Sequence, residues 1–396
     1  MDELIILALN SGSSSLKFGL YRWAEEIVEP LLQGDAGDEG SGVWRGSKMA
    51  PIENDALEVN RRVGSPADSI AAIVRKIVAG DLPKPMAVGH RIVHGGPGRR
   101  DHFLIEDASL SEIKRGGAFA PLHVAAATEI IVEARRAFPD MPHVACLDTA
   151  FHKNLPEQAR TLPIDPTSTA GVERYGFHGL SCASIVHQLG KDIPPRLIVA
   201  HLGSGASVTA IRDRRSVDTS MGMTPTGGMM MATRSGDLDP GVLLYLMRER
   251  GFGRVQLEDL LDRRSGMLGV SGVSGNLREL RRVSTLQPAA RLAISMFAIA
   301  AAKQIAMMMV SLGGVDAVVF TGGIGENDAA MRATIIEHLA WSGLAIDPGL
   351  NELGAGRIEV ESSRPSVYVL PSKEQEEIVR SVATLIRTSP TKNSYG

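Results

Sequence analysis

The pattern of apolar and polar positions predicts paired strands at two places in the chain. Apolar runs at 4–10 and 16–21 flank a short polar segment, and runs at 197–201 and 207–211 flank a glycine-rich one. Each pair predicts two strands joined by a turn. The turns, Asn10-Ser-Gly-Ser and His201-Leu-Gly-Ser, share one layout about 190 residues apart, which favours a duplicated domain.

The other periodic segments predict an α/β fold. Segment 33–66 is polar and glycine-rich, which is typical of edge strands and exposed loops, and a proline-rich stretch at 156–166 marks a boundary between two halves. A length of 396 residues also favours two domains. Helices are predicted at 69–79, 124–138, 241–250, 255–261, 288–312, 328–339 and 374–386, and further strands at 86–93, 143–147, 317–320 and 367–370.

Composition excludes several classes of protein. Apolar residues make up 44% and charged residues 22%, which is ordinary globular usage. A formal net charge of −3 provides no field for nucleic acid or for an anionic membrane surface. Cys146 and Cys182 form no C-x-x-C motif, so neither a disulfide framework nor structural zinc is expected. Glycine is the unusual residue, because 42 of 396 is about 11%, against roughly 7% on average.

The longest apolar stretch, 292–315, contains Lys303 and ends at Gly313-Gly314. We interpret it as a buried helix and not as a membrane span. The acidic N-terminus and its short apolar run predict no signal peptide. We therefore expect a soluble, cytoplasmic protein that does not bind membranes.

The glycines gather at three predicted strand ends, in turns at 11–15, 202–206 and 321–325. Such turns let backbone N–H groups approach a polyphosphate closely, so three of them favour a nucleotide cleft. The segment from Gly12 to Lys17 lacks the second glycine of a P-loop, and the segment from Gly203 to Val208 lacks the third glycine of a dinucleotide-binding turn. Both of those fold classes are thus excluded.

Charged residues and histidines occur in the same kind of position. Arg91 and Arg234 lie beside glycines, where two arginines can clamp an anion, although an ordinary salt bridge explains each one equally simply. Asp148 ends a predicted strand and could hold Mg²⁺ or cap a helix. His178 is flanked by small residues, unlike a histidine of a hydrophobic core.

Seven segments together resemble the acetate kinase family. They occur in the family's order and span nearly the whole chain. The segments are Asn10-x-Gly-Ser-Ser-Ser-Leu-Lys17-Phe, Gly89-His-Arg-Ile-Val-His-Gly-Gly96, Asp148-Thr-Ala-Phe-His152, Arg174-Tyr-Gly-Phe-His-Gly179, His201-Leu-Gly, Thr233-Arg-Ser-Gly-Asp-Leu-Asp-Pro240 and Phe320-Thr-Gly-Gly-Ile-Gly-Glu-Asn327.

The resemblance implies two duplicated RNase H-like domains that face a central cleft, as in sugar kinases, chaperone ATPases and actin. The implied domains are 1–147 plus 376–396, and 148–375, the second of which binds the nucleotide and forms a homodimer. The implied reaction is reversible, in-line phosphoryl transfer from ATP to acetate, giving acetyl phosphate and ADP, with Mg²⁺ or alternatively Mn²⁺. Acetate is already ionised at neutral pH, so the reaction needs no general base.

The resemblance also implies roles for individual residues. Arg91 and Arg234 would contact acetate and the transferring phosphoryl group, and His178 would donate to that group. Asn10 and Asp148 complete the implied catalytic set, and Asn10 and Glu374 would hold the metal. Val93, Leu122, Phe177 and Pro225 would enclose the methyl group of acetate, and with Arg91 they form the implied substrate-binding set. The implied nucleotide and phosphate contacts are Ser13, Ser15, Lys17, His123, His201, Gly203, Ser204, Gly205, Asn276, Leu277, Arg278, Gly322, Gly323, Ile324, Gly325 and Asn327.

Some positions depart from the family's pattern. Ser204 stands where the family usually has Asn, and Asn276 where an Asp-containing segment usually meets the adenosine. Glu374 is the best match to the metal-binding glutamate, with Glu376 and Glu377 as alternatives. Propionate as acceptor, or GTP or pyrophosphate as donor, are therefore alternatives within the family. A nucleotide-gated binding protein of the same fold is the alternative of another class, but the chain has no segment long enough for a substrate-binding appendage.

Overall fold

The computed structural model of the chain describes residues 3–11, 15–37, 45–46, 66–117, 119–169 and 171–388. The chain divides into two compact units, Met1–Ala150 with Lys373–Gly396, and Phe151–Ser372. Asp148 and Glu374, which the sequence analysis assigned to the second domain, fall within the first unit. The chain passes from the first unit to the second within a short 3₁₀ turn, η1 (Ala150–His152).

The first unit is built on a sheet of seven described strands in the order β4-β3-β2-β1-β5-β7-β6. Strands β1, β2 and β3 pair antiparallel, whereas β1, β5 and β7 run parallel. The bounds are β1 (Leu4–Ser11), β2 (Ser15–Ala24), β3 (Ile27–Gly37), β4 (Arg45–Gly46), β5 (Ala87–Ile92), β6 (Phe103–Leu104) and β7 (His143–Leu147).

The second unit repeats this arrangement in six described strands, in the order β10-β9-β8-β11-β13-β12. Strands β8, β9 and β10 pair antiparallel, and β8, β11 and β13 run parallel. Both sheets thus have three antiparallel strands followed by two parallel neighbours, so the expected duplicated α/β fold is confirmed. The bounds are β8 (Arg196–Leu202), β9 (Ala206–Arg212), β10 (Arg215–Thr219), β11 (Ala317–Thr321), β12 (Gly356–Arg357) and β13 (Ser366–Val369).

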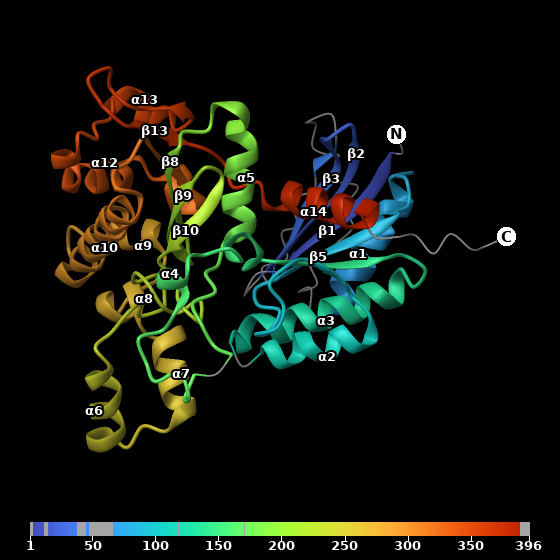
Figure 1. Cartoon of the computed structure of the whole chain (residues 1–396), viewed down its shortest axis with the longest axis horizontal. Helices are drawn as coiled ribbons and strands as arrows, with labels where there is room; N and C mark the ends of the chain where they lie inside the picture. The colour runs from blue at the N-terminus through green and yellow to red at the C-terminus, as the bar shows by residue number, and fades with distance from the viewer. Residues whose placement is uncertain are drawn as a thin grey trace. The chain divides into compact units, whose positions relative to one another are not determined.

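Helices cover the sheets of both units (Figure 1). The first unit has α1 (Pro66–Ala79), α2 (Asp107–Gly116), α3 (Pro121–Ala137) and α14 (Glu374–Thr388). The second has α4 (Glu157–Arg160), α5 (Gly179–Leu189), η2 (Gly190–Asp192), α6 (Pro240–Arg250), α7 (Arg254–Arg263), α8 (Gly266–Ser271), α9 (Leu277–Val283), α10 (Pro288–Leu312), α11 (Gly322–Asn327), α12 (Ala329–His338), η3 (Ala340–Ser342) and α13 (Pro348–Leu353).

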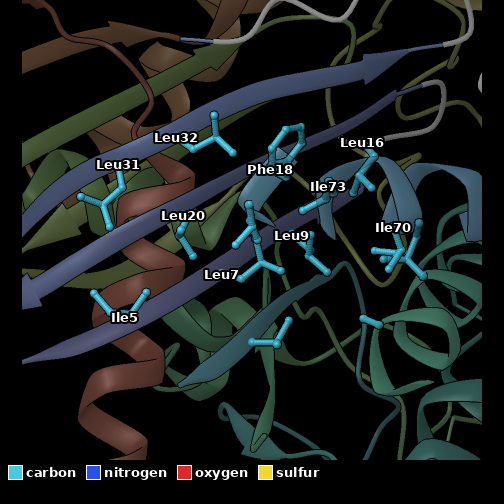
Figure 2. Close-up of a cluster of buried hydrophobic side chains, with 14 residues drawn as sticks. Ile5, Leu7, Leu9, Leu16, Phe18, Leu20, Leu31, Leu32, Ile70 and Ile73 are labelled. Atoms are coloured by element: carbon cyan, nitrogen blue, oxygen red, sulfur yellow. The ribbon is translucent and has the colours of Figure 1, made fainter. Parts of the chain in front are cut away.

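The core of the first unit follows from the period-two pattern of its strands. Leu7 and Leu9 alternate along β1, and Phe18 and Leu20 alternate along β2, so their side chains share one face of the sheet. Figure 2 shows these side chains together with Ile73 of α1, which packs against the same face. This cluster fixes where β1 ends, and β1 carries Asn10 at that end.

The last helix, α14, belongs to the first unit although it is far away in the sequence. It packs against β1, β2, β5 and β7, as Figure 1 shows in red. A side chain at Gly89 of β5 would collide with Ile378 and Val382 of α14, so glycine is required there for the close approach. This packing brings Glu374, the first residue of α14, to the end of the sheet.

Helix α10 is the one described helix that is long and apolar enough to span a membrane by length and composition. Half of its most apolar window is buried, and it packs against β8, β9 and β10. Gly313 ends it in the left-handed conformation, with φ of 67°. The helix therefore packs as a core helix, as the sequence analysis expected.

Several elements differ from the sequence-based prediction. Strand β3 begins at Ile27, earlier than expected, and β10, α2 and α5 were not predicted at all. Helix α5 is missed because seven of its eleven residues are buried, so no polar stripe reveals its period. The turn expected at 321–325 is wrong, because the chain becomes helical at Gly322 directly after β11.

Candidate active site

The first unit gathers four polar side chains at one end of its sheet. Asn10 lies near the end of β1, Arg91 near the end of β5, and Asp148 follows β7. The carboxyl ends of these parallel strands meet at one edge, where the backbone N–H of Asp148 donates to Ile92 at 3.0 Å. Glu374 reaches the same edge from α14.

These side chains form one hydrogen-bonded network, which we call the carboxylate network (Asn10, Arg91, Asp148 and Glu374). Arg91 Nε and Nη2 donate to Asp148 Oδ2 at 3.1 and 2.6 Å, and Nη1 donates to Asn10 Oδ1 at 3.1 Å. Asn10 Nδ2 donates to Glu374 Oε2 at 2.9 Å, and that oxygen lies 3.9 Å from Arg91 Nη1. Each member therefore orients at least one other.

Burial makes the carboxylate network electrostatically strong. The side chain of Asp148 is 1% exposed and that of Arg91 is 15% exposed. Burial raises the pKa of Asp148, and the Arg91 guanidinium opposes that rise. Burial alone would lower the pKa of Arg91, but the charges of Asp148 and Glu374 outweigh this effect and raise it, so Arg91 stays a cation. Removing either partner would leave a buried charge uncompensated.

The second unit gathers histidine and arginine donors around the turn between β8 and β9. A side chain at Gly205 would lie 3.2 Å from His178 Nε2 and 3.4 Å from Arg234 Nη1, so both groups flank this glycine. Arg234 Nη1 also donates to the carbonyl of Pro225 at 3.2 Å. We call His178, His201, Gly205 and Arg234 the donor cluster.

Serine hydroxyls orient the two imidazole rings of the donor cluster. His178 Nδ1 lies 2.9 Å from Ser207 Oγ, and His201 Nδ1 lies 2.8 Å from Ser181 Oγ. The two rings are stacked, with centroids 4.1 Å apart. Each Nε2 lies near a glycine: a side chain at Gly205 would lie 3.2 Å from that of His178, and one at Gly322 would lie 3.1 Å from that of His201.

The sequence does not indicate that Ser181 and Ser207 contact the histidines, because nothing local distinguishes them from other serines. Ser181 lies in the first turn of α5, and Ser207 is near the start of β9. Ser181 Oγ also lies 3.0 Å from Ser372 Oγ. Only the packing of α5 beside β8 shows which hydroxyls reach the histidines.

The glycine-rich segments at 202–206 and 321–325 lie next to each other in the second unit. A side chain at Gly322, which has φ of 78°, would lie 2.8 Å from the carbonyl of Leu202, and one at Gly203 would lie 3.7 Å from the backbone nitrogen of Gly323. β8 and β11 bring them together because they pair in parallel up to His201 and Thr321. A side chain at Gly322 would collide with Leu202, so this glycine permits the close approach, whereas the distance at Gly203 is an ordinary contact.

The segment Asn276–Leu277–Arg278 is tied to the same region. Asn276 Oδ1 accepts from the backbone of Arg278 at 2.9 Å and thereby caps α9. A side chain at the preceding Gly275 would lie 2.8 Å from the carbonyl of Ala232, whose own N–H donates to Ser204. Leu277 is buried, whereas the side chains of Ser204, Asn276 and Arg278 are exposed.

The remaining predicted residues have varied environments. Val93 and Phe177 are buried, at 6% and 1% exposure, and Pro225 is buried with its carbonyl on Arg234. The side chain of Lys17 is exposed, Ile324 and Asn327 lie within α11, and Gly325 is buried there. Ser13 lies outside the described residues, as do the side chains of Ser15, Leu122 and His123.

The carboxylate network fits a magnesium site in its donor types. No described group of three or more His, Cys, Asp or Glu side chains is arranged to hold a metal. Mg²⁺, however, is usually bound by one or two carboxylates, with phosphate oxygens and water as the other ligands. The carboxylates of Asp148 and Glu374, together with the amide oxygen of Asn10, match that requirement.

The duplicated RNase H-like fold is that of the actin-like ATPase superfamily, and arginine and histidine donors beside glycine turns are the equipment of a phosphotransferase. The model of the acetokinase family matches residues 5–380. The chain belongs to the acetokinase family, and the resemblance found in the sequence is confirmed.

Individual relatives agree with this assignment along their whole length. An acetate kinase of Deinococcus radiodurans is 40% identical over 394 residues, covering 96% of this chain and 98% of the relative. A propionate kinase structure of Francisella tularensis superposes with a TM-score of 0.83 at 34% identity, covering 96% of this chain and 98% of that one. An acetate kinase structure of Porphyromonas gingivalis gives 0.80 at 33% identity, with 97% and 100% covered.

Proposed function

We propose that this chain is an acetate kinase: it transfers a phosphoryl group reversibly from ATP to acetate, giving acetyl phosphate and ADP. The observation that carries the proposal is the convergence of His178 Nε2 and Arg234 Nη1 on Gly205. These two side chains bring hydrogen-bond donors close to the same stretch of backbone, as the binding of an anion requires. Membership of the acetokinase family supports the same conclusion.

The chemistry of the donor cluster suits a carboxylate acceptor. Acetate has a pKa near ~4–5 and is ionised at neutral pH, so no base has to remove a proton. The barrier comes from bringing two anions together and from holding charge on the equatorial oxygens of the phosphoryl group. Arginine and histidine donors stabilise that charge without taking part in proton transfer.

In this proposal His178 and Arg234 donate to the transferring phosphoryl group. In the proposed tautomer the Ser207 hydroxyl donates to Nδ1 of His178 and Nε2 carries the proton, and the carbonyl of Pro225 orients the guanidinium of Arg234. His201 Nε2, beside Gly322, contributes a further phosphate contact. Preorganised donors of this kind are each worth on the order of 10²–10³ in rate.

Arg91 binds the acetate carboxylate, and the other members of the carboxylate network hold it in place. Asp148 and Glu374 would hold Mg²⁺ through carboxylate oxygens, with the amide oxygen of Asn10 beside them. The metal, when bound, would neutralise phosphate charge. Mn²⁺ has similar oxygen-ligand preferences and is the alternative ion.

ATP is the proposed donor, bound by the glycine turn at 203–205 and by the start of α11. The backbone N–H group of Gly323 would face the phosphates, whereas that of Gly203 donates to the carbonyl of Gly205 at 3.0 Å. The segment from Asn276 to Arg278 would lie along the nucleoside. Ser204 and Asn276, the departures from the family's usual residues, have exposed side chains available to a nucleotide. GTP and pyrophosphate are therefore the alternative phosphoryl donors to compare with ATP.

Val93, Leu122, Phe177 and Pro225 are the residues proposed to contact the methyl group of acetate. Apolar contacts of this kind discriminate against one extra methylene by only ~1–3 kcal/mol. Propionate is accordingly a second candidate substrate, and the similarity to a propionate kinase structure favours testing it. We expect it to be used less efficiently than acetate.

The test is a direct assay of acyl phosphate formation. Purified protein, Mg²⁺ and ATP are incubated with acetate, propionate or butyrate, and the acyl phosphate is trapped as its hydroxamate. The expected order is acetate, then propionate, then butyrate. GTP and pyrophosphate are compared at equal concentration, and a tenfold advantage of either one over ATP would contradict the proposed donor.

We also propose that the protein acts as a homodimer in the cytoplasm. Helix α6 has no buried residue, and Leu244, Tyr245 and Met247 on it are each about half exposed, which a dimer contact would explain. Neither cysteine forms a disulfide and both are buried, as in reducing compartments. Sedimentation analysis tests the dimer, and fractionation of the producing cells tests the location.

A further inference from the structure

His152 is a buried histidine that the proposed reaction does not use. It ends the 3₁₀ turn that follows Asp148, and its side chain is 3% exposed. It ends the family segment Asp148–His152, but the sequence predicts no role for it. Its ring makes two hydrogen bonds, both within the second unit: Nε2 to the carbonyl of Phe177 at 2.9 Å, and Nδ1 to Ser216 Oγ at 2.8 Å.

These two bonds fix the tautomer of His152. A carbonyl only accepts, so Nε2 must carry the proton and donate it to Phe177. Nδ1 of the neutral ring then accepts from the hydroxyl of Ser216. Burial lowers the pKa of His152 to about 4, which keeps the ring neutral at physiological pH.

The bond to Phe177 acts immediately before His178. His178 has φ of 56° and ψ of 28°, a left-handed conformation that is unusual for a residue other than glycine. Only one peptide unit, the carbonyl of Phe177 with the N–H of His178, separates the His152 contact from this strained residue. A fixed carbonyl there sets the direction from which the His178 side chain leaves the backbone.

The neighbouring glycine shows that His152 is built into this loop. Gly176 has φ of 71°, and a side chain on it would lie 2.8 Å from Cγ of His152. The backbone of Gly176 donates to the carbonyl of Gly222 at 3.3 Å. The loop is thus pinned on one side by β10 and its following turn and on the other by the imidazole of His152.

We propose that His152 is a positioning residue for His178: its Nε2–H bond to the Phe177 carbonyl holds His178 in the left-handed conformation that aims Nε2 at the Gly205 turn. His152 itself touches no substrate. The inference rests on the proposed function, in which His178 donates a hydrogen bond to the transferring phosphoryl group.

Two substitutions of similar size separate the contacts of His152. The amide of His152→Gln can reach the carbonyl of Phe177, whereas that of His152→Asn reaches only as far as Ser216. We expect kcat to fall about 10–100-fold in His152→Asn and His152→Ala, with the KM values for ATP and acetate little changed. His152→Gln should retain kcat within a few fold, and Ser216→Ala serves as the control that keeps the Phe177 bond and kcat. Thermal unfolding of each variant shows that it is folded.

A double-mutant cycle with His178→Ala tests whether His152 acts through His178. If it does, adding His152→Asn to His178→Ala lowers kcat by less than about twofold, because the positioned group is already gone. Full additivity of the two losses, or equal kcat in His152→Asn and His152→Gln, would overturn the inference.

A readout that does not depend on turnover keeps the inference separate from the proposed reaction. The ring nitrogen signals of His178, assigned by their loss in His178→Asn, should shift in His152→Asn and stay in place in His152→Gln. Unmoved signals in His152→Asn would overturn the positioning role. A wild-type protein that forms no acyl phosphate would refute the proposed function, while the nitrogen signals would still decide the positioning of His178.

Discussion

The two units share one sheet topology but hold their polar residues in different ways. In the first unit, charged groups hold one another: Arg91 forks onto a buried Asp148, and Asn10 links Arg91 to Glu374. In the second unit, neutral groups orient the donors, such as the hydroxyls of Ser181 and Ser207. The same fold thus orients its candidate site residues by ion pairs in the first unit and by neutral hydrogen-bond partners in the second.

This difference has an energetic consequence. Deleting a member of the carboxylate network leaves a partner with an uncompensated charge in a buried place, so stability and activity should fall together. Replacing His178, His201 or Arg234 of the donor cluster removes a hydrogen bond to a hydroxyl or a carbonyl, which costs about 1 kcal/mol. In the second unit, activity should therefore be lost while stability is largely kept.

The largest effect is expected for Arg91→Ala. It removes the proposed acetate ligand and leaves Asp148 buried without its cation, so we expect a rate loss of at least about 10³-fold and a loss of about 3 kcal/mol in unfolding free energy. The hydroxamate assay and urea denaturation measure the two. In Arg91→Ala/Asp148→Asn the stability should largely return without the activity; a double variant as unstable as the single one would contradict the electrostatic explanation.

Arg234→Ala tests the same comparison in the second unit, where activity should be lost with little loss of stability. Its rate loss should be on the order of 10²–10³-fold, while its unfolding free energy should change by only about 1 kcal/mol, because its bond to Pro225 is to a neutral carbonyl. A destabilisation as large as that of Arg91→Ala would show that the two units do not differ in the way described.

Lowering the pH should also destabilise the two units to different extents. Burial lowers the pKa of His90, His94 and His143 in the first unit and of His152 in the second, with values of about 4 for His94 and His152. The folded protein keeps these rings neutral, whereas the unfolded chain binds protons below about pH 6.5, so unfolding becomes easier as pH falls from 6.5 to 4. Over this pH range, one such histidine lowers the free energy of unfolding by up to about 3 kcal/mol.

Hydrogen exchange at neutral pH and near pH 5, corrected for intrinsic rates, measures this effect in each unit. Because three of these four histidines lie in the first unit, its strands should lose more protection than those of the second. Equal losses in both units would count against the assignment.

The smallest effect is expected for Glu374→Gln, which keeps an oxygen near Asn10 but removes the charge. The Mg²⁺ concentration for half-maximal rate should rise about tenfold, with the rate at saturating Mg²⁺ reduced less. Glu376→Gln is the matched control, because Glu376 pairs with Lys373 and Arg380. A larger shift in the control variant would transfer the metal role to Glu376.

Local pattern was sufficient for the strands and helices with a strong period. Strand β7 and helix α10 have the predicted bounds, and the β1–β2 and β8–β9 pairs form as expected. It was insufficient for α5, whose mostly buried residues carry no polar stripe, and for the segment after β11, where glycines that suggest a turn form the start of α11.

The candidate site divides in the same way. Residue type and glycine context singled out Arg91, Asp148, His178 and Arg234, because few residues can hold or neutralise phosphate. Whether the arginines form salt bridges or bind anions was left open by the sequence. The structure shows that Arg91 is paired with Asp148, and that its Nη1 also extends toward Asn10.

What the sequence by itself determined is the duplication, the family and the charged residues, since strand periodicity and motif identity are local properties of the chain. Only the tertiary structure decided what holds the site residues in place. Ser181 and Ser207 bond to the two histidines of the donor cluster, and His152 bonds to the loop before His178. Helix α14 brings Glu374 to the end of the sheet. These partners are separated by up to hundreds of residues, and hydrogen bonds between them depend on the packing of strand ends and helices, which no local pattern encodes.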